Sequence, residues 1–106
     1  MKHNVSPYII QGFMVIESRY NPKATSGRGR CIGLMQLHRD TAKSLDVNPW
    51  VPKENIDGGT RVLSRLLKKY HGNLRRVMRI YNAESNGAYE REVFKAISQA
   101  KSRGER

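Results

Sequence analysis

A helix that is apolar on almost every side, and that stops before a proline, constrains the fold of this chain more than any other feature. Ser6 followed by Pro7 is a favourable helix start, because serine caps the first turn and proline suits the first helical position. The apolar residues that follow lie almost all round the helix: Tyr8, Ile9, Ile10, Phe13, Met14, Val15 and Ile16. Asn21-Pro22 ends it, because proline cannot continue a helix and restricts the residue before it. We therefore predict a central, largely buried helix over 7–19.

Glu17 stands near the end of this helix and faces a glycine-punctuated loop over 21–33. Its apolar neighbours and the partial negative charge of a helix C-terminus both disfavour a charged carboxylate, so its pKa is expected to be raised. A carboxyl that stays protonated near neutral pH can serve as a general acid. From these residues alone, a helix-end glutamate paired with Arg19 or another base is an open alternative.

Four further helices are predicted, over 40–46, 53–70, 73–83 and 88–102, because apolar residues recur there at helical spacing. Gly12, inside the first helix, lowers helix propensity, and we attribute it to the close approach of another helix. No β-hairpin pattern stands out. At 106 residues, the chain is expected to form one all-α domain of about five helices over 1–106.

The chain is strongly basic, with 20 Lys and Arg residues against 9 Asp and Glu and a formal net charge of +11. Such a field favours polyanions, including nucleic acid, an anionic membrane or an acidic cell wall. No apolar run approaches transmembrane length, and Gln11 and Gly12 interrupt the only stretch that could belong to a signal peptide. The single cysteine, Cys31, excludes a disulfide within the chain and is expected to fill a small buried space.

Two other features have a plain interpretation and a functional one. The histidines His3, His38 and His71 are scattered, without the close spacing of a metal site, so no metal is expected. Trp50, in a rigid turn before Pro52, is either a packing plug under the loop or a sugar-stacking platform at the edge of a groove.

Ordered motifs follow Glu17 along the chain. They are Glu-Ser-Arg-Tyr-Asn-Pro-Lys-Ala-x-Ser from Glu17, Gly-Leu-Met-Gln-Leu from Gly33, Thr-Ala at Thr41, Asn-Ile-x-x-Gly from Asn55 and Tyr-Asn-Ala from Tyr81. In this order they resemble the catalytic domain of the soluble lytic transglycosylases, which are lysozyme-like enzymes that cut bacterial peptidoglycan. The resemblance covers about residues 9 to 81 and implies a small lysozyme-like helical domain around the catalytic helix.

The resemblance implies cleavage of the β-1,4 bond between N-acetylmuramic acid and N-acetylglucosamine. Glu17 would protonate the glycosidic oxygen and then act as base on the sugar's own 6-hydroxyl, which gives a 1,6-anhydro product. No metal or organic cofactor is needed. The expected partner is the glycan strand, with no nucleic acid and no membrane span, and the expected state is a monomer. The site of action would be the bacterial cell wall, reached through phage lysis machinery, in a virion or after loss of a leader.

Further roles follow from the resemblance, position by position. Ser26 would orient the acid or the sugar, and Gln36 would line the cleft above a floor that contains Met35. Tyr81 would hydrogen-bond near the catalytic carboxyl, and Asn82 would hold the turn beside it. From spacing alone, Tyr81 could equally complete the apolar face of its helix.

Departures from the family's pattern leave two alternatives open. The loop after Ser26 is one residue longer than usual, Arg39 replaces a common proline, and Glu84 stands where the family usually has glycine. A second carboxylate near the cleft, Glu84 or Asp40, would favour a hydrolytic lysozyme on the same fold, although we expect Glu84 to point away. The other alternative is a basic nucleic-acid-binding module that uses the helix over 73–83.

Overall fold

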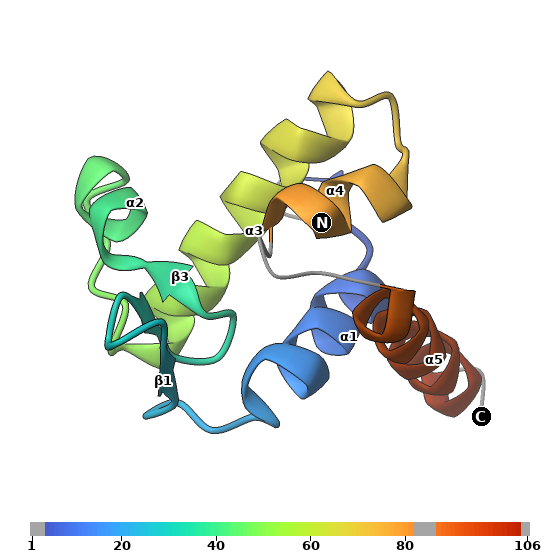
Figure 1. Cartoon of the computed structure of the whole chain (residues 1–106), viewed down its shortest axis with the longest axis horizontal. Coiled ribbons are helices and arrows are strands. Elements are labelled where there is room, and N and C mark those ends of the chain that lie inside the picture. Colours follow the sequence, from blue (N-terminus) through green and yellow to red (C-terminus); the bar gives the residue numbers. More distant parts are fainter. Residues whose placement is uncertain (1–3, 82–86, 105–106) are drawn as a thin grey trace.

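The computed structural model describes residues 4–81 and 87–104, without the side chains of 87–90, and is mostly helical (Figure 1). The helices of the described residues are α1 (Pro7–Ser18), α2 (Arg39–Ser44), α3 (Pro52–Lys69), α4 (Leu74–Tyr81) and α5 (Gly87–Gly104). The five predicted helices are therefore confirmed, with ends that shift by a residue or two. Positions 82 and 83, in the predicted end of the fourth helix, lie outside the described residues.

A small antiparallel sheet interrupts the stretch that we expected to be an irregular loop. Its strands are β1 (Thr25–Ser26), β2 (Cys31–Ile32) and β3 (Leu37–His38), in the order β1-β2-β3. Ser26 lies opposite Cys31, and Ile32 lies opposite Leu37. The expected mostly helical fold is confirmed, and no hairpin pattern stood out in the sequence because strands of two residues are too short to show an alternating pattern. Their connections use glycines with positive φ: Gly27, Gly29 and Gly33.

The sequence explains both ends of α1, which lies between the small sheet and α5 in Figure 1. At its start, the Tyr8 N–H donates to the Ser6 hydroxyl at 3.3 Å. At its end, Arg19 takes a left-handed conformation, and its N–H donates to the Val15 carbonyl at 3.0 Å. Residues 8–18 are all buried or half-buried, so the predicted central helix is confirmed.

The close approach expected at Gly12 is between α1 and α5. A Cβ atom at Gly12 would collide with the side chain of Ile97, so only glycine fits at this crossing. The core between the helices is formed by buried apolar side chains: Val5, Phe13, Met14, Leu34, Met35, Leu63, Val77, Met78 and Val93. Full burial of such a side chain is worth about 1.5–3 kcal/mol.

Two expectations about burial need correction. Trp50 is 51% exposed, so it is not a packing plug under the loop. Cys31 is only half-buried in β2, so it does not fill a closed space. Both lie in or after the region of short strands, where burial depends on contacts that the sequence pattern does not report.

Candidate active site

The end of α1 is fastened to the turn that joins β2 and β3. Glu17 lies in the last turn of α1 and is half-buried. The hydroxyl of Ser18, which is buried, donates to the Leu34 carbonyl at 2.7 Å, with the Met14 carbonyl as a second acceptor at 3.1 Å. This hydrogen bond joins residues 16 positions apart and fixes where α1 presents Glu17.

The turn itself is held by Asn55, a completely buried side chain on α3. Its oxygen accepts the Met35 N–H at 2.8 Å, and its NH2 group donates to the carbonyls of Ile32 at 2.7 Å and Pro49 at 2.8 Å. A Cβ atom at Gly33 would collide with this amide, which accounts for a glycine at that position. Asn55 belongs to one of the recognised motifs, but its role as a clamp was not predicted, because it depends on contacts between distant segments.

Ser26 and Gln36 join β1 to the same turn. The Ser26 hydroxyl donates to the side-chain oxygen of Gln36. The Gln36 NH2 group donates to the carbonyls of Gly33 at 2.8 Å and Ala24 at 3.1 Å. Gln36 is only 7% exposed, so most of its amide is used to hold the protein's own backbone. Contact of Ser26 and Gln36 with a substrate stays a prediction.

Tyr81 closes the arrangement from α4. Its hydroxyl donates to the Met35 carbonyl at 2.7 Å, and its ring packs edge-on against Phe13, with 5.1 Å between the centroids. Burial of the phenol end raises the pKa of Tyr81 far above its ordinary value, and the nearby Glu17 and Cys31 groups raise it further. The residue as a whole keeps some exposure. Tyr81 is therefore neutral at ordinary pH. Because the charge of Glu17 contributes to this shift of the Tyr81 pKa, the two side chains lie in the same part of the molecule.

The other predicted site residues are placed less directly. Asn82 and Glu84 lie outside the described residues. Asp40 is on the surface at the start of α2, where its side chain is 93% exposed and 3.8 Å from His38. Met35, by contrast, is completely buried, with its N–H held by Asn55 and its carbonyl by Tyr81.

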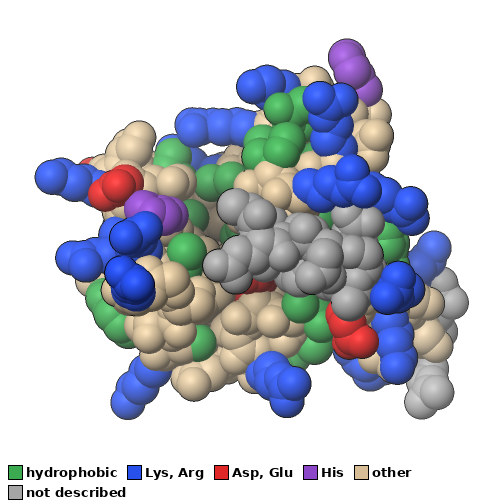
Figure 2. All heavy atoms as spheres, viewed as in Figure 1, with side chains coloured by type: hydrophobic (Ala, Val, Ile, Leu, Met, Phe, Trp, Pro, Cys, Tyr) green, Lys and Arg blue, Asp and Glu red, His purple; other side chains and the backbone are tan. Residues whose placement is uncertain are grey.

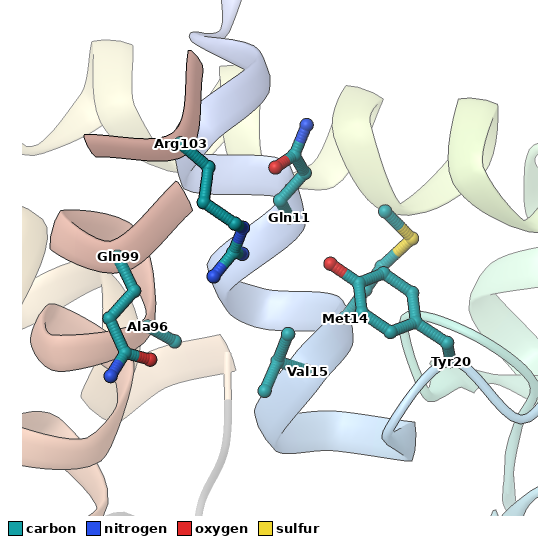
Figure 3. A pocket seen from close by; sticks show the side chains of 7 residues that line it. All are labelled: Gln11, Met14, Val15, Tyr20, Ala96, Gln99 and Arg103. Carbon is teal, nitrogen blue, oxygen red and sulfur yellow. The ribbon is translucent and has the colours of Figure 1, made fainter. Parts of the chain in front are cut away.

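A groove of about 750 Å³ runs along α1 on the side of α5 (Figure 3). Figure 3 shows the side chain of Arg103 extending from α5 toward α1, with Tyr20 at the other end of the groove. Tyr20 is 49% exposed and follows Glu17 by three positions. The groove is lined by neither Glu17 nor Tyr81, so it flanks the candidate site and does not contain it.

The surface around these features is basic. Lys and Arg side chains lie around most of the margin of the face seen in Figure 2, where few Asp and Glu side chains are visible. Within 4–81 and 87–104, no group of three His, Cys, Asp or Glu residues could hold a metal ion, and His3 lies outside that part. None of the helices in the same part is long and apolar enough to cross a membrane.

Together these features define a small, mostly helical domain in which a central helix presents a half-buried glutamate beside a short sheet and a neutral tyrosine. The sequence matches the model of the family described as the transglycosylase SLT domain over residues 1–105. The chain belongs to this family, and the resemblance found in its motifs is confirmed.

Relatives with related names support the same assignment. The chain is 40% identical over 88 residues to a transglycosylase of Enterobacteria phage PRD1, a match that covers 82% of this chain and 32% of the relative. Over 54 residues, half of this chain and 11% of the relative, it is 46% identical to membrane-bound lytic murein transglycosylase F of Pseudoalteromonas translucida. The Yersinia pestis protein of that name is 52% identical over the same length. The chain thus spans a third or less of these curated relatives. No solved structure gives a significant match.

Proposed function

We propose that this domain is a peptidoglycan lytic transglycosylase that cleaves the β-1,4 bond between N-acetylmuramic acid and N-acetylglucosamine. Family membership and the names of the relatives support the reaction class. The observation that carries the proposal for the site is the position of Glu17 in the last turn of α1, which Ser18 holds against the Leu34 carbonyl, near enough to Tyr81 for its charge to help raise the pKa of the phenol.

In this proposal, Glu17 makes both proton transfers. Its carboxyl group donates a proton to the glycosidic oxygen while the bond from that oxygen to C1 of N-acetylmuramic acid breaks, and N-acetylglucosamine leaves with a free 4-hydroxyl. The Glu17 carboxylate then accepts the proton of the muramic acid 6-hydroxyl group. The oxygen of that 6-hydroxyl group bonds to C1 of the same sugar. The nucleophile is already tethered to the sugar, which gives the step the advantage of an intramolecular reaction. The product is a 1,6-anhydro sugar, and Glu17 is protonated again.

The surrounding residues position this carboxyl group. Ser18 fixes the end of α1, and Met35 is held at its N–H by Asn55 and at its carbonyl by Tyr81. In the proposal, the backbone around Met35 forms the floor under the reacting sugar. Ser26, Gln36 and Asn82 then contribute to the binding of the glycan strand, as the family resemblance implies.

One of the two carboxylates that could support hydrolysis, Asp40, is poorly placed for it. A hydrolytic lysozyme usually needs a second carboxylate to activate water or attack the sugar. Asp40 is a poor candidate because its side chain is 93% exposed beside His38, and Glu84 is outside the described residues. The positive charge fits anionic cell-wall material, so we propose action on the wall, in the periplasm or outside the cell, by a monomer that needs no nucleic acid.

Digestion of purified peptidoglycan, followed by mass analysis, tests the proposal. The wild type is expected to release anhydro-muropeptides, each lighter by one water than the hydrolysis product. Glu17→Gln keeps nearly the same shape but cannot donate the proton, so the rate should fall by about 100- to 10,000-fold. Glu92→Gln, an exposed change of the same kind on α5, is the control and should act like wild type.

Two outcomes would contradict the proposal. Lysis at the wild-type rate by a folded Glu17→Gln protein would remove Glu17 from the mechanism. Reducing-end muropeptides that disappear in Glu84→Gln would show a hydrolytic lysozyme instead.

A further inference from the structure

Trp50 is the only tryptophan of the chain, and about half of its surface is exposed. Its neighbour Val51 is 37% exposed, so the turn before α3 presents a small apolar surface to solvent. A single exposed apolar side chain is common and proves little. An indole is nevertheless a large, flat group with one polar N–H, and such groups are typical of ligand contacts.

The turn that carries Trp50 is rigid. The backbone N–H of Trp50 donates to the side-chain oxygen of Asn48 at 3.0 Å, and the backbone N–H of Asn48 donates to the Glu54 carboxylate at 3.0 Å. The Pro49 carbonyl accepts a hydrogen bond from Asn55 at 2.8 Å, the same side chain that holds the candidate active site. A ligand that stacked on this indole would therefore order little backbone, which favours binding.

A hollow of about 430 Å³ lies beside the indole, between α2 and the turn before α3. This volume falls within the range of about 300–1,000 Å³ that is usual for small-molecule sites. Ala42 and Val47 supply apolar surface, while Asp46 and Asn48 supply a carboxylate and an amide. None of the proposed catalytic or substrate-binding residues lines this hollow.

Two cations complete the lining. Arg39 and Lys43 are exposed, lie four positions apart at α2 and both border the hollow. A flat aromatic face with nearby carboxylate and amide groups matches a sugar ring, whose C–H face stacks and whose hydroxyl groups hydrogen-bond. The cations match a carboxylate on that sugar. With Asp46 against Arg39 and Lys43, the lining carries only one surplus positive charge, which suits a single carboxylate better than the several charges of a polyphosphate.

We propose that this hollow is a second saccharide-binding site. Its ligand is an amino sugar that carries a carboxylate, namely the N-acetylmuramic acid of the glycan strand. Trp50 stacks on the ring, Asp46 and Asn48 bind its hydroxyl and acetamido groups, and Arg39 and Lys43 pair with the lactyl carboxylate. The inference rests on the proposed function for the choice of sugar. It adds a site that holds the wall without cutting it.

Because Trp50 is the only tryptophan, its fluorescence reports directly on this site. The Glu17→Gln chain, which does not consume the ligand, is titrated with the disaccharide N-acetylglucosaminyl-N-acetylmuramic acid and, separately, with neutral chitobiose. A saturable change in tryptophan emission is expected with the disaccharide. The further double change Arg39→Gln/Lys43→Gln should weaken its binding by roughly 2- to 30-fold, the range for two exposed charge contacts, and leave chitobiose unaffected.

The control removes two charges elsewhere. Arg65→Gln/Lys68→Gln, on the exposed face of α3, should leave disaccharide binding unchanged. In an otherwise wild-type chain, Trp50→Ala should bind less to insoluble peptidoglycan yet cleave a short soluble glycan at the wild-type rate. Trp50→Phe, which keeps a ring, should restore part of the binding.

The inference is overturned if the disaccharide gives no saturable change in emission, or if both double variants weaken its binding equally. It is also overturned if Trp50→Ala sediments with peptidoglycan as well as wild type does. Failure of the proposed function gives a different result, namely a wild-type chain that releases no sugar products while Trp50 still responds to the disaccharide. Cleavage of the wall without any response of Trp50 removes this inference alone.

Discussion

Replacing Asn55 with alanine should destabilise the domain more than most single changes, because this buried amide makes three hydrogen bonds. A net contribution of about 0.5–1.5 kcal/mol for each bond gives roughly 1.5–4.5 kcal/mol in total. The Met35 N–H and the carbonyls of Ile32 and Pro49 would lose their partner in a closed space. At about 4–8 °C per kcal/mol for a domain of about this size, Tm should fall by roughly 6–36 °C.

Asn55→Asp separates hydrogen bonding from packing, because the two side chains have nearly the same shape. As a carboxylate, Asp would direct oxygen at the carbonyls of Ile32 and Pro49, so burial and these dipoles should raise its pKa in the folded state. In the unfolded chain that pKa is about 3.9. The unfolded state thus loses its proton first, and the stability of the variant should fall as the pH rises above about 4.

Urea unfolding followed by circular dichroism, at several pH values between 4 and 8, measures both effects. Asn21→Ala is a suitable control, because Asn21 accepts one hydrogen bond at an exposed site, where water can replace it. If the free energy of unfolding of Asn55→Ala lies within about 0.5 kcal/mol of the wild-type value, a loss typical of surface changes, Asn55 does not hold the turn as described. An Asn55→Asp protein whose loss of stability is the same at every pH would contradict this role as well.

Three other outcomes are expected. Tyr81→Phe removes the hydrogen bond to the Met35 carbonyl, so the free energy of unfolding should fall by about 0.5–1.5 kcal/mol. The lytic rate should also fall strongly. Because the folded-state pKa of Tyr81 is raised, the wild type should also lose stability above about pH 10, and urea unfolding of Tyr81→Phe should lack this contribution. Gly12→Ala should lower the free energy of unfolding by about 1–3 kcal/mol through the collision with Ile97, whereas an unchanged Tm would contradict that crossing. In turbidity assays, the lysis of intact walls should fall as the salt concentration rises, because exposed charges are screened beyond about 8 Å at physiological salt. The cleavage of neutral chitin-like oligomers should fall less over the same range of salt. Equal sensitivity of the two reactions would count against electrostatic wall binding.

The sequence by itself determined the helices and the family. Capping at Ser6, the apolar run that follows it and the stop at Pro22 are local effects, so they define α1 without knowledge of the rest of the fold. The ordered motifs from Glu17 to Tyr81 identified the transglycosylase family for the same reason, since residue type and order can be read directly. One domain over 1–106 and the role of each site residue stay predictions.

Only the tertiary structure decided which groups meet. The strands of the small sheet are too short to leave a pattern, and the half-exposed position of Trp50 follows from the hydrogen bonds of its turn. Asn55 reaches Met35 across 20 positions and Tyr81 reaches it across 46, so neither contact follows from local preference. Such contacts form because the helices bury one shared core, and the packing of that core brings distant backbone groups to the same place.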